Sequence, residues 1–185
     1  MNHLKLLGLL AVAVTALLAF AGSAPAASVT SSAGTTPNIV ATSTNVAFHG
    51  AFTTVECKHS VIEWNVESHG AGVPVGGSID SLDFTECNHA VTMNNKGGFA
   101  IHAAATTGDG TVTWTGGNIT IHTSVGICTF TSNGTDIGTL DGKTGAVIDI
   151  KSAKIPRTAG NFLCGSSGTW TGSYNVTSPH TLEIH

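Results

Sequence analysis

The sequence predicts an all-β protein, an antiparallel β-sandwich or β-barrel of about ten to twelve short strands, apart from a helical leader at its start. Three observations lead to this prediction. Apolar and polar residues alternate in one segment after another, as in strands with one buried face. Glycine- and asparagine-rich sequences separate these segments and suit tight turns. Charged residues make up only 10% of the chain, which disfavours lysine- and glutamate-rich helices.

Residues 1–26 have the layout of a secretory signal peptide. Lys5 gives a basic start, an apolar run from Leu6 to Phe20 follows, and small residues come next. We predict cleavage between Ala26 and Ala27, with cleavage after Ser23 as the second option. The apolar run has about 15 residues, fewer than the roughly 20 of a bilayer-spanning helix. We therefore expect a mature chain without a membrane span, secreted and located in the medium or at the cell surface.

The mature chain divides into a leader and one domain. Residues 27–44 are small and polar, and we predict a flexible leader there with at most a short strand at Ile39 and Val40. Residues 45–185 carry the alternation and form a single predicted β domain. Trp64, Trp114 and Trp170 each alternate with polar neighbours and share a face with other apolar residues. We expect all three in the core rather than on a sugar-binding surface.

Turn sequences set the predicted strand ends. Their glycines and asparagines supply the positive φ angles that tight hairpins require. The predicted turns are Gly70–Gly77, Asn94–Gly98, Gly108–Gly110, Gly116–Asn118, Asn133–Gly134, Asp141–Gly142 and Ala159–Asn161.

Four cysteines follow the leader, and an even number in an exported chain indicates two disulfides. Three pairings are open. We favour Cys57–Cys87 with Cys128–Cys164, because each bridge then closes a local loop. Zinc sites use close pairs such as C-x-x-C, and the cysteines here are at least 30 residues apart.

Three segments carry a resemblance to a known group of proteins. These are Val55–Cys57, Ser81–Cys87 and the run from Ile155 to Cys164, which precedes a Trp-x-x-x-Tyr-x-Val strand at Trp170. The chain resembles a family of uncharacterised, exported, two-disulfide, β-rich proteins of high-GC actinobacteria. The resemblance implies export and disulfides, and it brings no activity with it.

The charge of the chain argues against one class of partner. The chain has seven basic and eleven acidic side chains. Loss of Lys5 with the signal peptide leaves six basic against eleven acidic side chains, a formal charge of −5. Nucleic acid would be repelled. Lys151, Lys154 and Arg157 cluster, which suggests a small anion-contacting patch for a cell-wall or other extracellular polymer. A solvated strand end is the interpretation that we favour for these three residues.

Histidines and acids are the candidates for chemistry. His102 and His122 fall on the polar sides of their strands, and a meander would bring them together, with Asp109, as zinc or copper ligands. We favour the alternative for both, in which they substitute for other polar residues on a sheet surface, and we predict no metal site. Asp80, Asp83 and Glu86 do not share one face of a strand.

No catalytic motif emerges from these residues, and we expect no cofactor. The sequence therefore favours a secreted, non-catalytic protein with a binding or structural role outside the cell. The alternative is a secreted hydrolase or metal-dependent enzyme that draws histidines and aspartates from several strands.

Overall fold

The computed structural model describes residues 26–32, 34, 37–71, 73–104, 108–124 and 126–185. The predicted signal peptide lies outside these residues, apart from Ala26. Fourteen strands and one short 3-10 helix occupy the described residues: β1 (Ala26–Ala27), β2 (Val29–Ser31), β3 (Asn38–His49), β4 (Thr54–Asn65), β5 (Ser68–Ala71), β6 (Val73–Cys87), β7 (Val91–Asn95), β8 (Gly98–Ala103), β9 (Gly110–Thr123), β10 (Gly126–Asp141), β11 (Lys143–Thr144), β12 (Val147–Ala159), η1 (Phe162–Cys164), β13 (Ser167–Ser178) and β14 (Thr181–Ile184).

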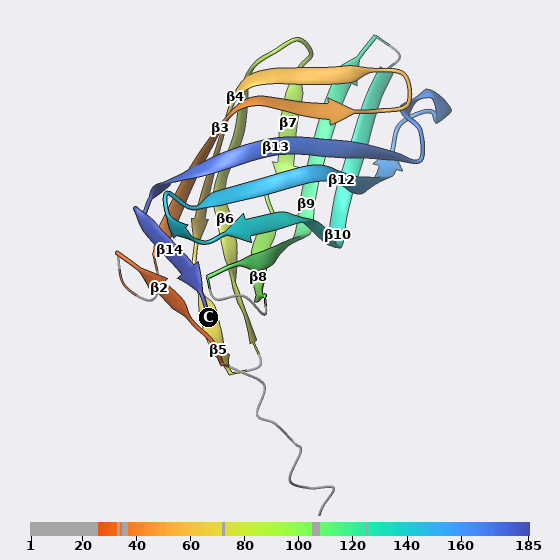
Figure 1. The fold of residues 1–185 in the computed structure, drawn as a ribbon. Helices are drawn as coiled ribbons and strands as arrows, with labels where there is room; N and C mark the ends of the chain where they lie inside the picture. Colours follow the sequence, from red (N-terminus) through yellow and green to blue (C-terminus); the bar gives the residue numbers. More distant parts are fainter. Residues whose placement is uncertain (1–25, 33, 35–36, 72, 105–107, 125) are drawn as a thin grey trace, which may run out of the picture.

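Eight of these strands close into an antiparallel barrel in the order β6-β4-β3-β13-β12-β10-β9-β8, with β8 pairing back onto β6. Closure satisfies the backbone groups that an open sheet would leave at its edges. In Figure 1 the long strands β12 and β13 cross β6 and β9 at a steep angle, so the barrel walls form two crossing layers. The prediction of an all-β antiparallel fold is confirmed, and the sandwich-or-barrel alternative resolves to a barrel with additional strands.

A small second sheet, β11-β14-β2, lies at one end of the barrel. Ser28 and His185 exchange two backbone hydrogen bonds of 2.9 and 3.0 Å beside this sheet. Gly108 pairs with Ile184 and links the sheet to the segment before β9. The two ends of the described chain therefore meet at this end of the barrel, which we call the capped end.

The strands are longer than the sequence suggested, because several predicted turns are irregularities inside strands. Gly116 and Gly134 have φ angles of 73° and 72°, and both lie within continuous strands, β9 and β10. The β9–β10 ladder shifts register around Asn133. A glycine with positive φ beside a register shift is the usual arrangement of a β-bulge, which a hairpin signature resembles in sequence.

The predicted flexible leader over residues 27–44 also differs from the structure. β2 pairs with β14, and β3 begins at Asn38 rather than after residue 44. Ile39 and Ala41 are buried in the core, and Asn38 to Thr44 pair with β4. The alternation of small residues in this stretch fits a strand, although its polar composition is typical of a linker.

Three described non-glycine residues have positive φ angles: Asn45 (64°), Glu86 (52°) and Ser152 (52°). Asn45 and Ser152 each follow another exposed residue, and burial resumes at the next position beside a register shift. Glu86 instead lies one residue before the end of β6, in unbroken register with β4. A bulge such as those at Asn45 and Ser152 lets one long strand keep apolar residues in the core on both sides of a bend.

Aromatic side chains fill the barrel. Trp170 is fully buried and contacts four other rings, with centroid distances of 5.4 Å to Trp114, 5.8 Å to Phe48 and 6.0 Å to Tyr174. The hydroxyl of Tyr174 donates a hydrogen bond of 3.0 Å to Ser60 Oγ. The predicted burial of all three tryptophans is confirmed. The interior is a packed core.

Candidate functional site

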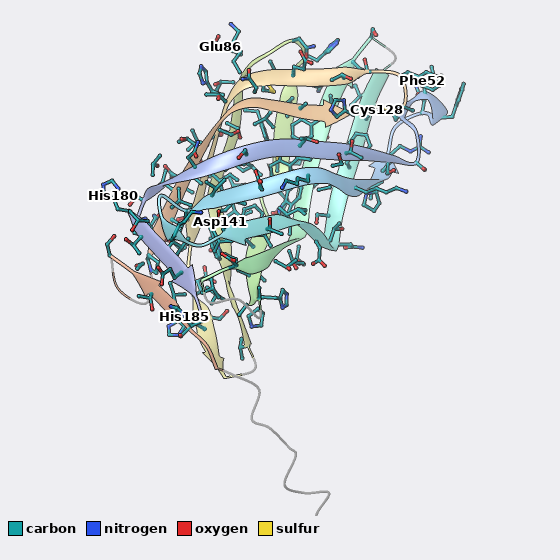
Figure 2. All side chains as sticks on the ribbon, viewed as in Figure 1. Phe52, Glu86, Cys128, Asp141, His180 and His185 are labelled. Atoms are coloured by element: carbon teal, nitrogen blue, oxygen red, sulfur yellow. A yellow bond between two sulfur atoms is a disulfide. The ribbon has the colours of Figure 1, made fainter. Side chains whose placement is uncertain are left out.

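The end of the barrel opposite the capped end carries an exposed apolar surface. Two loops supply its most prominent side chains: Phe52, 67% exposed, in the turn between β3 and β4, and Phe162, 80% exposed, in η1. Ile127, 55% exposed, lies at the beginning of β10 beside Cys128. Figure 2 shows Phe52 and Cys128 at this end, far from Asp141 and His185. We call this surface the mouth.

A shallow apolar depression lies between the loops of the mouth. Phe48, Val55, Ile119, Phe130 and Ile155 form its floor, and Phe52 and Leu163 lie at its rim. Its cavity volume is about 20 Å³, room for roughly one water molecule. The mouth is therefore an apolar surface with a shallow depression, which is too small to enclose a ligand of drug size.

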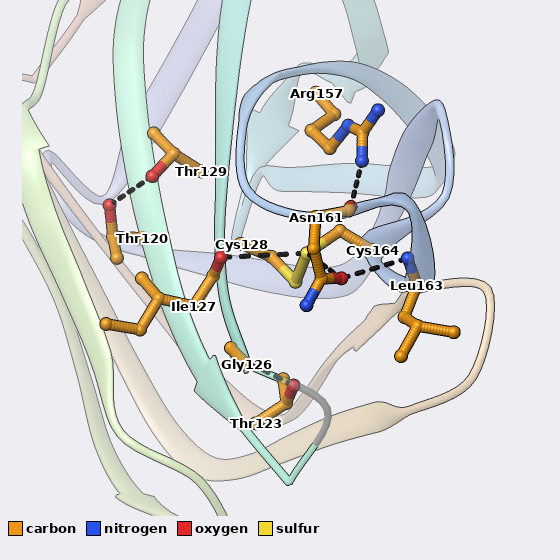
Figure 3. The surroundings of a disulfide bond; sticks show 10 residues. All are labelled: Thr120, Thr123, Gly126, Ile127, Cys128, Thr129, Arg157, Asn161, Leu163 and Cys164. Atoms are coloured by element: carbon orange, nitrogen blue, oxygen red, sulfur yellow. Dashed lines mark hydrogen bonds between the residues drawn. A yellow bond between two sulfur atoms is a disulfide. The ribbon is translucent and has the colours of Figure 1, made fainter.

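A disulfide fixes the η1 loop to the barrel wall. Cys164, the last residue of η1, is bonded to Cys128 in β10, and Figure 3 shows the loop folded over this bridge. The side chain of Asn161 caps η1 by accepting a hydrogen bond of 2.9 Å from Leu163 N. The backbone of Gly160, with φ of 111°, passes so close to Ile127 O that an added Cβ would lie at 2.6 Å. Phe162 is thus presented by a constrained loop.

Arg157 braces the same loop from β12. Its guanidinium donates a hydrogen bond to the backbone oxygen of Asn161. Its backbone N–H donates to Ser166 O at 3.0 Å. Among the described residues no ion pair includes Arg157. The positive charge of Arg157 therefore lies beside Phe162 without a carboxylate to neutralise it.

The mouth differs in charge from the capped end. The three segments that line it, residues 48–54, 119–131 and 155–169, contain no aspartate or glutamate. Their ionisable side chains are those of Arg157, His49 and His122. Asp141 at the end of β10 and Glu183 in β14 lie toward the capped end, whereas Glu56 follows the lining residue Val55 in β4. The segments that line the mouth thus hold no carboxylate, in a protein that is acidic overall.

A second hollow, polar and open, lies over the other disulfide. Its volume is about 500 Å³. The residues that line it around the Cys57–Cys87 bridge are Asn45, Glu56, Lys58, Glu86 and Asn88. Lys58 Nζ donates to Glu86 at 2.9 Å, and this hydrogen bond, with the attraction between the charges, holds the pKa of Glu86 below its ordinary value. Lys58 and Glu86 neutralise one another, and Glu56 is a second acid in the lining.

Both disulfides have the favoured pairing, Cys57–Cys87 and Cys128–Cys164. Cys57 and Cys87 are direct partners in the β4–β6 ladder. Cys128 and Cys164 instead join a strand to a loop. The first bridge therefore reinforces an existing sheet, and the second holds a segment outside the sheet.

The predicted histidine pair does not form, because the two residues lie at opposite ends of the barrel. His102 pairs with Thr111 near the beginning of β9, and His122 lies eleven residues further along that strand. This separation is about 36 Å at the rise of an extended strand. The expected three-strand meander is wrong, because its second and third strands are one continuous strand, β9, whose first half pairs with β8. Within the described part of the chain, no three His, Cys, Asp or Glu side chains gather as metal ligands.

The other polar candidates have local partners. Asp80 accepts a hydrogen bond from Asn65, and Asp83 accepts one of 2.7 Å from Ser81. Lys151 pairs with Asp149 at 3.1 Å, whereas Arg157 faces the η1 loop. The predicted basic cluster is thus divided between an ion pair on the barrel wall and the mouth.

Sequence reasoning missed the mouth, although a trace of it is present. Phe52 stands among small or polar neighbours in Gly50–Thr53, and Phe162 with Leu163 interrupts the small and polar loop before Cys164. Large aromatic residues inside turn segments are a departure from the usual polar composition of loops. The sequence does not show that the two turns meet at one end of a barrel.

No protein family, curated protein or solved structure matches this chain. In the part of the chain that the structure describes, no helix is long and apolar enough to cross a membrane. The fold and the mouth therefore define the molecule as a disulfide-clamped, eight-stranded antiparallel barrel with an apolar surface at one end.

Proposed function

We propose that this protein is a non-catalytic binding protein that acts outside the cytoplasm, and that the mouth is its binding site. The observation that carries the proposal is the exposure of Phe52 and Phe162 on two neighbouring loops above an apolar depression. Clustered apolar side chains on a soluble surface mark interaction sites, because leaving them in water brings no benefit to the free protein.

The construction of the mouth supports a binding role. The Cys128–Cys164 bridge, the Asn161 cap and Arg157 hold the loop of Phe162 in place. Binding to a prearranged surface loses less conformational entropy than binding to a mobile loop. An aromatic side chain held this way contributes more of its burial energy to the complex.

Location outside the cytoplasm is the second part of the proposal. Two disulfides and no free cysteine among the described residues suit an oxidising compartment. The signal-peptide layout of residues 1–26 supports export. The resemblance to exported actinobacterial proteins agrees with this location and stays a prediction.

The mouth favours an apolar partner over the expected extracellular polymer. A cell-wall polysaccharide is recognised by converging hydrogen-bond groups, whereas the lining of the depression is almost entirely apolar. The alternative of a hydrolase or metal enzyme needs acids and histidines gathered from several strands. His102 and His122, the pair singled out for it, lie at opposite ends of the barrel, so we do not propose it.

Dye binding tests the mouth as a binding site. We expect the processed chain, residues 27–185, to bind an anilinonaphthalene sulfonate dye in its folded state. The variant Phe52→Ser/Phe162→Ser should lose most of the dye fluorescence. Val73→Ser is the matched control, because Val73 is 45% exposed in β6, outside the mouth. Equal fluorescence from the double variant and the control would overturn the proposal.

A further inference from the structure

We propose that the mouth docks on the surface of an anionic lipid membrane, with Phe52 and Phe162 inserted among the headgroups and Arg157 facing the lipid phosphates. The inference rests on the proposed function and names the partner of the same site. It combines the exposed phenylalanines, the small depression and the absence of carboxylates from the three segments that line the mouth.

The size of the depression favours a surface over a small ligand. A cavity of about 20 Å³ does not enclose an acyl chain or an aromatic ring. The barrel below is filled by Trp170 and its neighbouring rings, so the depression does not continue inward. The apolar groups that need burial are therefore the protruding side chains themselves. A bilayer interface takes up such side chains without a deep pocket on the protein.

Apolar exposure on separate loops also fits this partner. Phe52 comes from the β3–β4 turn and Phe162 from η1, yet the two loops touch: a Cβ placed on Gly165 would lie 2.9 Å from Ala51 Cβ. Two aromatic side chains at one end of a barrel enter an interface together. Phenylalanine is among the apolar side chains that proteins bury at the boundary between headgroups and acyl chains.

Charge selects an anionic surface in particular. A protein with a formal charge of −5 after processing is repelled by such a surface unless its acids point away. The lining segments of the mouth hold no carboxylate, and Arg157 lies at the foot of the Phe162 loop. Asp141 and Glu183 lie toward the capped end. A basic side chain near an anionic membrane favours binding, and Arg157, which has no ion pair among the described residues, is the basic side chain that the mouth offers.

Arg157 is also placed to donate to phosphate oxygens. A guanidinium has five N–H donors, and the described contact uses its Nη1 toward Asn161 O. Planar, bidentate recognition of phosphate is characteristic of arginine. The same residue thus braces the loop and presents positive charge beside the inserted ring.

Vesicle sedimentation tests the inference with the processed chain, residues 27–185, which contains nearly all of the described elements. The probes are vesicles of phosphatidylcholine alone and of equimolar phosphatidylcholine and phosphatidylglycerol. We expect binding to the anionic vesicles, weakened by added salt because screening reduces the attraction. Phe52→Ser and Phe162→Ser should each lower the partition coefficient roughly tenfold, as loss of a buried phenylalanine predicts.

Arg157→Gln removes the positive charge and keeps an amide donor on a shorter side chain. We expect it to lower partitioning into anionic vesicles roughly fivefold and to change partitioning into vesicles of phosphatidylcholine alone far less. Val73→Ser and Lys143→Gln are the matched controls, because they remove an exposed apolar group and an exposed charge outside the mouth. Both should partition like the unmodified chain.

The outcomes distinguish this inference from the proposed function. Dye binding at the mouth without vesicle binding, or equal binding to both kinds of vesicle, overturns the lipid proposal and leaves the function standing. Loss of both overturns both. If the unmodified chain dimerises in sedimentation equilibrium and the Phe52→Ser/Phe162→Ser variant is monomeric, a second copy covers the mouth, and the lipid proposal is wrong.

Discussion

Removing the Cys128–Cys164 bridge should have two separable effects, one on global stability and one on the mouth. The bridge spans 36 residues, and the chain-entropy relation gives about 4 kcal/mol for such a loop. For a domain of this size, 1 kcal/mol corresponds to roughly 2–4 °C in Tm. We therefore expect Cys128→Ala/Cys164→Ala to lower Tm by roughly 8–16 °C in calorimetry.

The other disulfide supplies the matched control. Cys57–Cys87 spans 30 residues, so Cys57→Ala/Cys87→Ala should lose a similar amount of stability, about 4 kcal/mol. Its two residues are partners within the β4–β6 ladder, and the pairs beside them, such as His59 with Thr85, persist without the bridge. The η1 loop instead depends on its bridge for attachment to β10.

Hydrogen exchange and dye binding then separate the two variants. We expect faster amide exchange at residues 162–165 and weaker dye binding at the mouth only in Cys128→Ala/Cys164→Ala, measured below its unfolding transition. If both variants show the same exchange in η1 and the same dye binding, the bridge does not prearrange Phe162. The reasoning on the mouth would then fail even if both stability losses match.

Two further predictions concern the core. Burial raises the pKa of Tyr174 well above its ordinary value, so the folded protein keeps a proton that the unfolded chain releases above about pH 10. The free energy of unfolding should therefore fall as pH rises beyond that point. Tyr174→Phe, which removes the only tyrosine, should abolish this slope in alkaline denaturation curves. Gly117→Ala would place a Cβ 1.8 Å from the Trp114 ring, so we expect a loss of at least about 2 kcal/mol in urea unfolding, against little change for Gly50→Ala; equal stability of the two glycine variants would refute this packing.

Alternation predicted the fold class because burial repeats every second residue on one face of a strand. Trp170 and Tyr174 are buried as that pattern requires. It failed where bulges interrupt the period, at Asn45 and Ser152. Two outward residues in a row look like the end of a strand when only sequence is considered.

Long-range placement was beyond the local pattern. The distance between His102 and His122 depends on whether residues 110–123 form one strand or two, and the predicted turn Gly116–Asn118 is an irregularity inside one strand. The mouth depends in the same way on the meeting of the turn of Phe52 with the loop of Phe162. The cysteine pairing was predictable because each bridge joins cysteines that are consecutive in the chain.

The backbone pairing of Ser28 with His185 has a practical consequence for handling this protein. Both ends of the processed chain emerge on the side away from Phe52 and Phe162. A tether, dye or tag fused after residue 185 would therefore display the aromatic loops outward from a sensor chip or bead. Immobilisation through that terminus leaves these loops free to meet a partner from solution.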